Sequence, residues 1–245
     1  IEAAVDWPCR LERLDQPRNL GCRRGVVAAL DWFFERVGEG IVLEDDILPD
    51  PSFFPYAAEL LVRYRHDPAI GAICGATVGR APGDGGSYRF SRFVPVWGWA
   101  TWRRAWRCND PELLSWRQGD RAEALGQLRR WGGTRFARRM ASFLDDVAEG
   151  RCDTWDYGWF YSCWRHGLHG CLPAVNLVRN QGFGDPLASH CQKGRSPLPP
   201  PRSLPLPLGH PARRRPDPRA DAVLFERLYA PRLPLRAWRR MQPCG

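Results

Sequence analysis

The sequence has 245 residues and a mass of 28.0 kDa, enough for one sizeable α/β domain or two small ones. A hydrophobic content of 44% with 26% charged residues excludes wholesale disorder, and no apolar run approaches the roughly 20 residues that span a bilayer. The formal net charge of +9 is concentrated in residues 195–245, which carry 11 arginines and three acidic residues, whereas residues 1–194 are nearly neutral.

Nine cysteines are scattered along the chain without the close pairs of a zinc or redox motif. Because no secretory leader opens the chain, we expect reduced thiols and no disulfide scaffold. These features predict a cytoplasmic protein whose basic tail allows contact with the inner face of the membrane.

The first predicted elements alternate between helix and strand. Helical periodicity covers residues 24–37, and residues 41–43 then form a short buried strand. A second helix begins with Asp50 as its N-cap and Pro51 at its first position, and residues 69–76 form a second buried strand. The apolar face predicted for this second helix comprises Phe53, Phe54, Ala57, Leu60, Leu61 and Tyr64. The alternation predicts an α/β fold with a mostly parallel central sheet flanked by helices.

The middle of the chain is predicted to be mainly helical. Helix-like stretches cover residues 121–131, 134–149 and 153–166. Two short strand-like runs follow in residues 168–183 and are broken at Pro173.

Two stretches are predicted to lack regular structure. The glycine-rich residues 79–86 do not have the pattern of a phosphate-binding loop and are expected to form a surface loop. The last 50 residues hold 12 of the 23 prolines and are expected to be extended or irregular. We therefore predict a folded domain over residues 1–194 and a Pro/Arg-rich C-terminal extension over residues 195–245.

Three consecutive carboxylates, Glu44, Asp45 and Asp46, follow the first predicted strand. Ligands of open α/β sheets bind beyond the carboxyl ends of the strands, and carboxylates there suit Mg²⁺ or Mn²⁺ shared with phosphate oxygens. The alternative is a solvated acidic turn that helps to cap the helix at Asp50.

Nine of the twelve tryptophans lie between residues 97 and 164. The glycine between Trp97 and Trp99 indicates a loop, and flat aromatic faces with polar edges suit a sugar ring. Plain core packing is the alternative, above all for Trp102 and Trp106.

Two further stretches contain candidate catalytic or metal-binding residues. Asp153 is a plausible N-cap for the helix that follows it, and Asp156 is either a second capping carboxylate or a base beside three aromatic residues. His190 follows an Asn- and Gly-rich loop, a setting that can bring an imidazole to a metal or a diphosphate.

In this order, the motifs resemble those of bacterial nucleotide-diphospho-sugar transferases of the GT-A fold, with distant similarity to N-acetylglucosaminyltransferase I. The matching blocks span nearly the whole chain, and the combination of EDD after a strand with WDYGW is the specific part. These blocks are VDWPC (5–9), RNLGC (18–22), IVLEDDILPDPSFFPY (41–56), VWGWATWRRAW (96–106), WDYGWFYSCW (155–164), NLVRNQGFGDPLASH (176–190) and PLPLGHPARRRPDPRAD (205–221).

The resemblance implies a metal-dependent glycosyltransferase that moves a sugar from a nucleotide-diphospho-sugar to an acceptor hydroxyl with inversion. Asp46 matches a ligand of Mn²⁺ or Mg²⁺ and Asp156 the catalytic base, while His190 is a weaker metal match. The predicted nucleotide contacts are Asn19, Arg23, Glu44 and Asp45. The predicted wall for the acceptor or sugar comprises Trp97, Trp99 and Trp155. The implied partners are a nucleotide-sugar donor and a glycan or lipid-linked acceptor.

GT-A domains begin with a strand–loop–helix unit that holds the nucleotide base. The resemblance implies that about 50 residues of this kind are missing at the front, a size judged from typical element lengths. The alternative function is therefore a non-catalytic glycan-binding module. Binding of nucleic acid or of an anionic membrane through Arg213–Arg215 and Arg239–Arg240 is a third hypothesis; no recognised nucleic-acid motif accompanies these residues.

Overall fold

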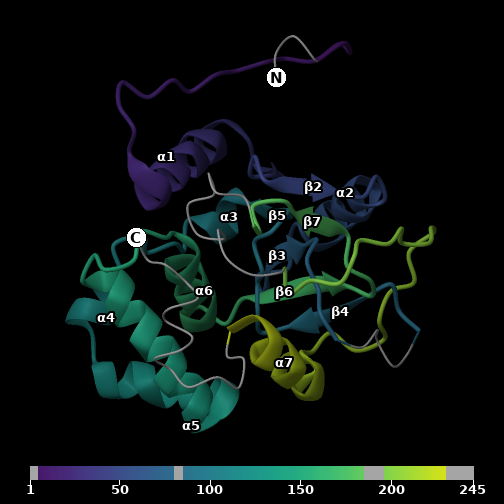
Figure 1. The fold of residues 1–245 in the computed structure, drawn as a ribbon. Coiled ribbons are helices and arrows are strands. Elements are labelled where there is room, and N and C mark those ends of the chain that lie inside the picture. Colours follow the sequence, from purple (N-terminus) through teal and green to yellow (C-terminus); the bar gives the residue numbers. More distant parts are fainter. Residues whose placement is uncertain (1–4, 80–84, 185–195, 230–245) are drawn as a thin grey trace.

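The computed structural model describes residues 5–79, 85–184 and 196–229. A five-stranded sheet lies at the centre, with helices packed against it on both sides (Figure 1). One hydrophobic cluster joins the sheet to α2 (Phe53–Tyr64), and a larger one joins it to the helices of the opposite side. The predicted α/β class is therefore confirmed.

The strands are mixed in direction, which corrects the prediction of a mostly parallel sheet. Their order is β1 (Glu39–Val42), β5 (Trp99–Trp102), β3 (Ile70–Cys74), β6 (His169–Pro173) and β4 (Tyr88–Ser91). Only β3 and β6 pair in parallel in this sheet; its other three pairs are antiparallel.

The sheet is mixed because of the position of β5. Strands β1 and β3 flank α2 in the chain and run in the same direction, as the alternation predicts, but β5 lies between them and is antiparallel to both. Ala100 of β5 pairs with Ile41 on one side and with Ile73 on the other. As a result β1 is an edge strand, half-buried instead of buried, whereas β3 is buried along its whole length.

Helix α1 (Gly21–Arg36) buries Leu30 and Phe34, in agreement with the predicted periodicity. Helix α2 begins at Phe53 with Ser52 as its N-cap, which corrects the prediction of Asp50 as N-cap and Pro51 at the first position. The Asp50 carboxylate instead accepts hydrogen bonds from the Ser52 N–H and hydroxyl in the turn just before the helix. The predicted apolar face of α2 is buried except for Phe54, which is 44% exposed.

The helical middle of the chain contains α3 (Arg103–Trp106), α4 (Leu114–Gln118), α5 (Arg121–Ala148) and α6 (Asp156–Arg165). Within α5, Gly133 has φ +81° and ψ 178°, a conformation that favours glycine, and it separates the two helical stretches that the sequence predicts. Strands β2 (Ile47–Pro49) and β7 (Val178–Asn180) form a separate antiparallel pair. Residues 80–84 of the glycine-rich stretch lie outside the described residues.

Residues 196–229 pack against the central sheet and its helices. Residues 218–229 are helical, with α7 (Pro218–Leu224) and a π-helical turn (Phe225–Tyr229), whereas residues 196–217 are irregular as predicted. Leu204 and Leu208 join the cluster around α2, and Leu224, Phe225 and Tyr229 join the larger cluster. The predicted extension therefore contributes to the core.

Among the described residues, six cysteines are free: Cys9, Cys22, Cys74, Cys108, Cys163 and Cys171. Cys152 is disulfide-bonded, which corrects the expectation of reduced thiols at that position. Within the described ranges, every helix is too short or too polar to pass through a lipid bilayer.

Candidate functional site

The predicted acidic motif lies in the turn between β1 and β2. The Ile47 N–H donates to the Glu44 carbonyl at 3.1 Å and closes the turn. From the other side, the Gln181 N–H donates to the Asp46 carbonyl at 2.7 Å, and the buried Asn180 side chain hydrogen-bonds the Asp46 carboxylate. Its own closing hydrogen bond and one distant segment, residues 180–181, therefore hold the turn in place.

Asp156 is the first residue of α6. Its Oδ1 accepts hydrogen bonds from the Thr154 hydroxyl at 2.6 Å and from the Tyr157 N–H at 2.8 Å. These bonds orient the carboxylate, and a carboxylate is also favoured at a helix N-terminus because of the free N–H groups there.

Asp153 does not cap α6, which corrects the prediction for this residue. Its carboxylate accepts hydrogen bonds from the Cys22 N–H at 2.8 Å and the Arg23 N–H at 3.3 Å, so it caps α1 instead. The approach is close at Gly21, whose φ is +77° and where an added Cβ would lie 2.5 Å from Asp153 Oδ2. The segment before α6 thus joins the start of α1 to the start of α6.

The acidic groups share one electrostatic environment. Burial raises the pKa of Glu44 to about 7, with further contributions from Asp46, Asp156 and Asp45, and an indole hydrogen bond from Trp155 partly offsets this rise. Burial and the neighbouring Asp45 also raise the pKa of Asp46.

The thiol of Cys22, on α1, is exposed to the same negative charges. Its thiol pKa is raised to about 12, first by burial and then by the negative charges of Asp156, Glu44, Asp153 and Asp46. Carboxylates from two separate parts of the chain, residues 44–46 and residues 153–156, therefore act on one point. Clustered acids with raised pKa values are typical of functional sites, although structural networks show them too.

The donor chemistry fits a hard divalent cation. Within the described ranges no group of three potential metal-ligating side chains is assembled, and His190 lies outside those ranges. Mg²⁺ in phosphate-binding sites commonly takes one or two carboxylates and completes its shell with water and phosphate oxygens. Asp46, with Glu44 or Asp45, can supply such a set.

The predicted nucleotide contacts Asn19, in the RNLGC block, and Arg23, directly after it, lie around the start of α1. Asn19 is exposed, and its side-chain oxygen accepts a hydrogen bond from the Gly21 N–H at 2.8 Å. The Arg23 guanidinium lies 3.8 Å from the Glu112 carboxylate and 3.5 Å from the Val147 carbonyl. Its Nε is buried without a hydrogen-bond partner in the described structure.

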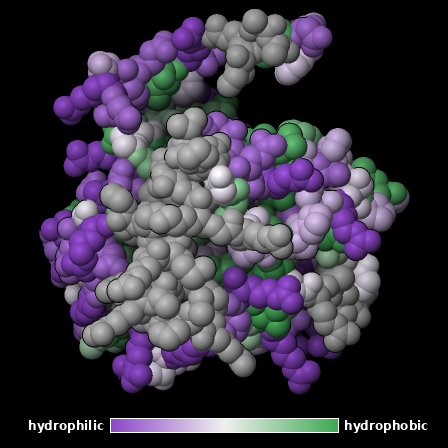
Figure 2. Space-filling view, viewed as in Figure 1, coloured by the Kyte–Doolittle hydropathy of each residue, from purple (hydrophilic) through white to green (hydrophobic). Residues whose placement is uncertain are grey.

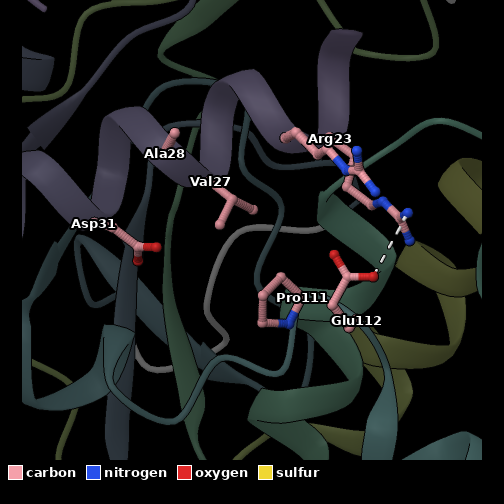
Figure 3. Close-up of a pocket in the computed structure, with 7 residues that line it drawn as sticks. Arg23, Val27, Ala28, Asp31, Pro111 and Glu112 are labelled. Atoms are coloured by element: carbon pink, nitrogen blue, oxygen red, sulfur yellow. Dashed lines mark ion pairs between the residues drawn. The ribbon is translucent and has the colours of Figure 1, made fainter. Parts of the chain in front are cut away.

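Arg23 borders a groove between α1 and the segment before α4 (Figure 3). The groove has a volume of about 360 Å³ and contains both basic and acidic side chains. Its lining residues are Arg23, Arg24, Val27, Ala28, Asp31, Pro111 and Glu112. Apart from Arg23, no sequence motif indicated these residues, because Pro111 and Glu112 reach α1 only through the fold.

The predicted tryptophan wall is reduced to one residue. Trp99 and Trp155 are 0% and 3% exposed, and they stack at 5.7 Å inside a core cluster with Trp106 and Trp159. Neither can present a face to a sugar, because both faces are used in packing. Trp97 is partly exposed and meets the ring of Phe183 edge-on at 5.9 Å.

Trp102 and Trp106 follow the core-packing alternative. Both are buried, and their indole N–H groups donate to the Leu61 carbonyl and to Asp31.

No protein-family model and no curated protein sequence matches this chain. The functional interpretation therefore depends on the residues of the site.

Proposed function

We propose that this chain is a metal-dependent glycosyltransferase domain of the GT-A type. It would move a sugar from a nucleotide-diphospho-sugar to an acceptor hydroxyl with inversion at the anomeric carbon. The observation that supports this most is the common environment of Glu44, Asp46 and Asp156, which are distant in sequence but share electrostatic neighbours.

In this proposal each carboxylate has a separate task. Asp46 holds Mn²⁺ or Mg²⁺, and Glu44 and Asp45 lie nearer the ribose of the donor. When bound, the cation neutralises the charge that develops on the departing diphosphate. Asn180 keeps the Asp46 carboxylate oriented through its hydrogen bond.

Asp156 is the proposed general base. It accepts the proton of the acceptor hydroxyl while that oxygen forms a bond to the anomeric carbon and the bond to the diphosphate breaks. Thr154 and the Tyr157 N–H hold one carboxylate oxygen in a fixed direction, which favours a positioned base. The same bonds also suit a purely structural helix cap, so turnover must separate the two roles.

Isothermal titration of a panel of nucleoside diphosphates, with and without Mn²⁺, tests the donor site. We expect Mn²⁺-dependent binding of one nucleotide, loss of that binding in Asp46→Asn, and normal binding in Asp217→Asn, which changes an exposed helix cap elsewhere. Nucleotide binding that is unaffected by Mn²⁺ or by Asp46→Asn would show that the metal assignment is wrong.

Turnover of the bound donor with a hydroxyl acceptor tests the base. We expect Asp156→Asn to bind the nucleotide normally and to lose catalysis by about 10²-fold or more. Near-normal turnover with a lower melting temperature would assign Asp156 to capping alone.

Trp97 favours a second candidate function, that of a non-catalytic glycan-binding module. Its partial exposure beside Phe183 leaves an aromatic surface that can contact a sugar. Glycan binding that Trp97→Ala abolishes, in a chain that binds no nucleoside diphosphate, would support this function over the transferase.

A further inference from the structure

The bend of α5, residues 129–139, is a strongly basic stretch that the proposed site does not use. We call it the α5 elbow. Residues 129–139 read RRWGGTRFARR, with five arginines and no acidic residue, although residues 1–194 as a whole are nearly neutral. Four of these arginines are exposed and Arg139 is buried.

The elbow has a defined shape because glycine and aromatic contacts form it. Gly133 breaks the helix, and an added Cβ there would meet nothing within 4 Å, so the bend faces open space. Phe136 anchors the other side of the bend, with its ring 5.2 Å from both Trp164 and Phe225. Figure 1 shows the two halves of α5 meeting at an angle at the bottom of the molecule. In Figure 2, the coloured residues along this lower margin are mostly hydrophilic.

Most of the charge on the elbow is not neutralised within the described structure. Arg135 forms an ion pair with Glu226, but Arg129, Arg130 and Arg138 form none with the described residues. Clustered like charges repel one another, and this repulsion is relieved when an anionic surface supplies counter-charges.

The surroundings of Trp131 favour one class of polyanion. The Arg92 guanidinium lies over its ring at 5.8 Å, and the His169 ring lies 6.0 Å away. Proteins bind single-stranded nucleic acid by stacking its bases on aromatic side chains. With its ring contacted in this way, Trp131 is poorly suited to such stacking. A partly buried tryptophan among arginines is instead suited to the headgroup region of a bilayer, where guanidinium groups pair with phosphates.

From these observations we propose that the α5 elbow binds the surface of an anionic phospholipid membrane. The contact is peripheral, and it depends on Arg129, Arg130 and Arg138 more than on the basic triplet Arg213–Arg215 of the C-terminal segment. The proposal is independent of the transferase assignment, because it uses none of the carboxylates of that site.

Co-sedimentation with vesicles tests the proposal. The vesicles contain phosphatidylcholine with phosphatidylglycerol, or phosphatidylcholine alone, at low and at physiological salt. We expect binding only to the anionic vesicles, weakened by salt. Joint substitution of Arg129, Arg130 and Arg138 by Gln is expected to weaken binding about tenfold or more. The same positions changed to Lys, which keep the charge, are expected to retain most of the binding.

A matched control removes an equal charge elsewhere. Joint substitution of Arg213, Arg214 and Arg215 by Gln should weaken binding less than about threefold if the elbow is the contact. Equal losses in the two triple variants, or a larger loss in the control, would overturn the assignment to the elbow. Failure of the unaltered chain to bind anionic vesicles, or binding of RNA in their place, would overturn the membrane proposal itself. Circular dichroism and melting curves show whether each variant is folded.

Discussion

The carboxylate of Asp221 on α7 should be one of the most sensitive positions for stability. Its Oδ1 accepts hydrogen bonds from Arg89 Nη1 at 2.9 Å and the Ser91 hydroxyl at 2.6 Å, and its Oδ2 accepts one from the Arg92 N–H at 3.0 Å. The side chains of Arg89 and Asp221 are only 6% and 5% exposed. A single carboxylate thus ties the C-terminal segment to β4.

Substitution Asp221→Ala should lower the free energy of unfolding by about 3–5 kcal/mol, because it leaves the Arg89 guanidinium charged and unpaired in the interior. Arg89 Nη2 already has no hydrogen-bond partner in the described structure, so little remains to compensate the charge. Asp217→Ala is the matched control on the same helix. It removes an exposed cap that accepts from the Arg219 and Ala220 N–H groups and should cost about 1 kcal/mol.

Urea unfolding followed by tryptophan fluorescence measures both variants. A loss for Asp221→Ala of about 1 kcal/mol or less, equal to the control, would refute the interpretation that residues 196–229 are part of the folded body. The double variant Arg89→Met with Asp221→Leu provides a second check. It should recover most of the lost stability, because it removes the charged partner together with the carboxylate.

Three further predictions concern titration, the helix break and the tryptophans. In metal-free protein at pH about 4.5 to 7, folded Glu44 binds more protons than unfolded Glu44, so the stability that this group contributes falls as pH rises; Glu44→Gln should remove this fall in urea titrations across pH. Gly133→Ala, at a φ of +81°, should destabilise the protein by about 1–3 kcal/mol in thermal unfolding, whereas Gly126→Ala, within the same helix, should be neutral or stabilising by up to about 1 kcal/mol. Trp99→Ala should cost about 3–5 kcal/mol because it empties a core position, whereas Trp97→Ala should change stability much less and reduce sugar binding; equal effects on stability would contradict this division.

Local spacing was sufficient to predict much of the secondary structure. The periodicity of residues 24–37 predicts most of α1, the apolar spacing after Asp50 predicts most of α2, and the break between residues 131 and 134 falls at Gly133. These features depend on neighbours within one or two turns, which the sequence displays directly.

Partners that are distant in the chain could not be predicted in this way. The insertion of β5 between β1 and β3 turned an expected parallel sheet into a mixed one. Asp153 caps α1 rather than the helix that follows it. In each case hydrogen bonds to a distant segment decided the outcome, and no local pattern specifies which segment arrives.

One part of the candidate site could likewise be predicted from the sequence, and the other part depended on the tertiary structure. The order of residues around the first strand was enough to single out Glu44, Asp45 and Asp46 as a possible metal motif, because a carboxylate run after a strand is a local feature. Tertiary structure alone brought Asp156 into the electrostatic environment of Glu44 and buried Trp99 and Trp155 in the core. Burial and charge proximity arise from packing between distant segments, so the chemistry of these side chains is settled only when the chain folds.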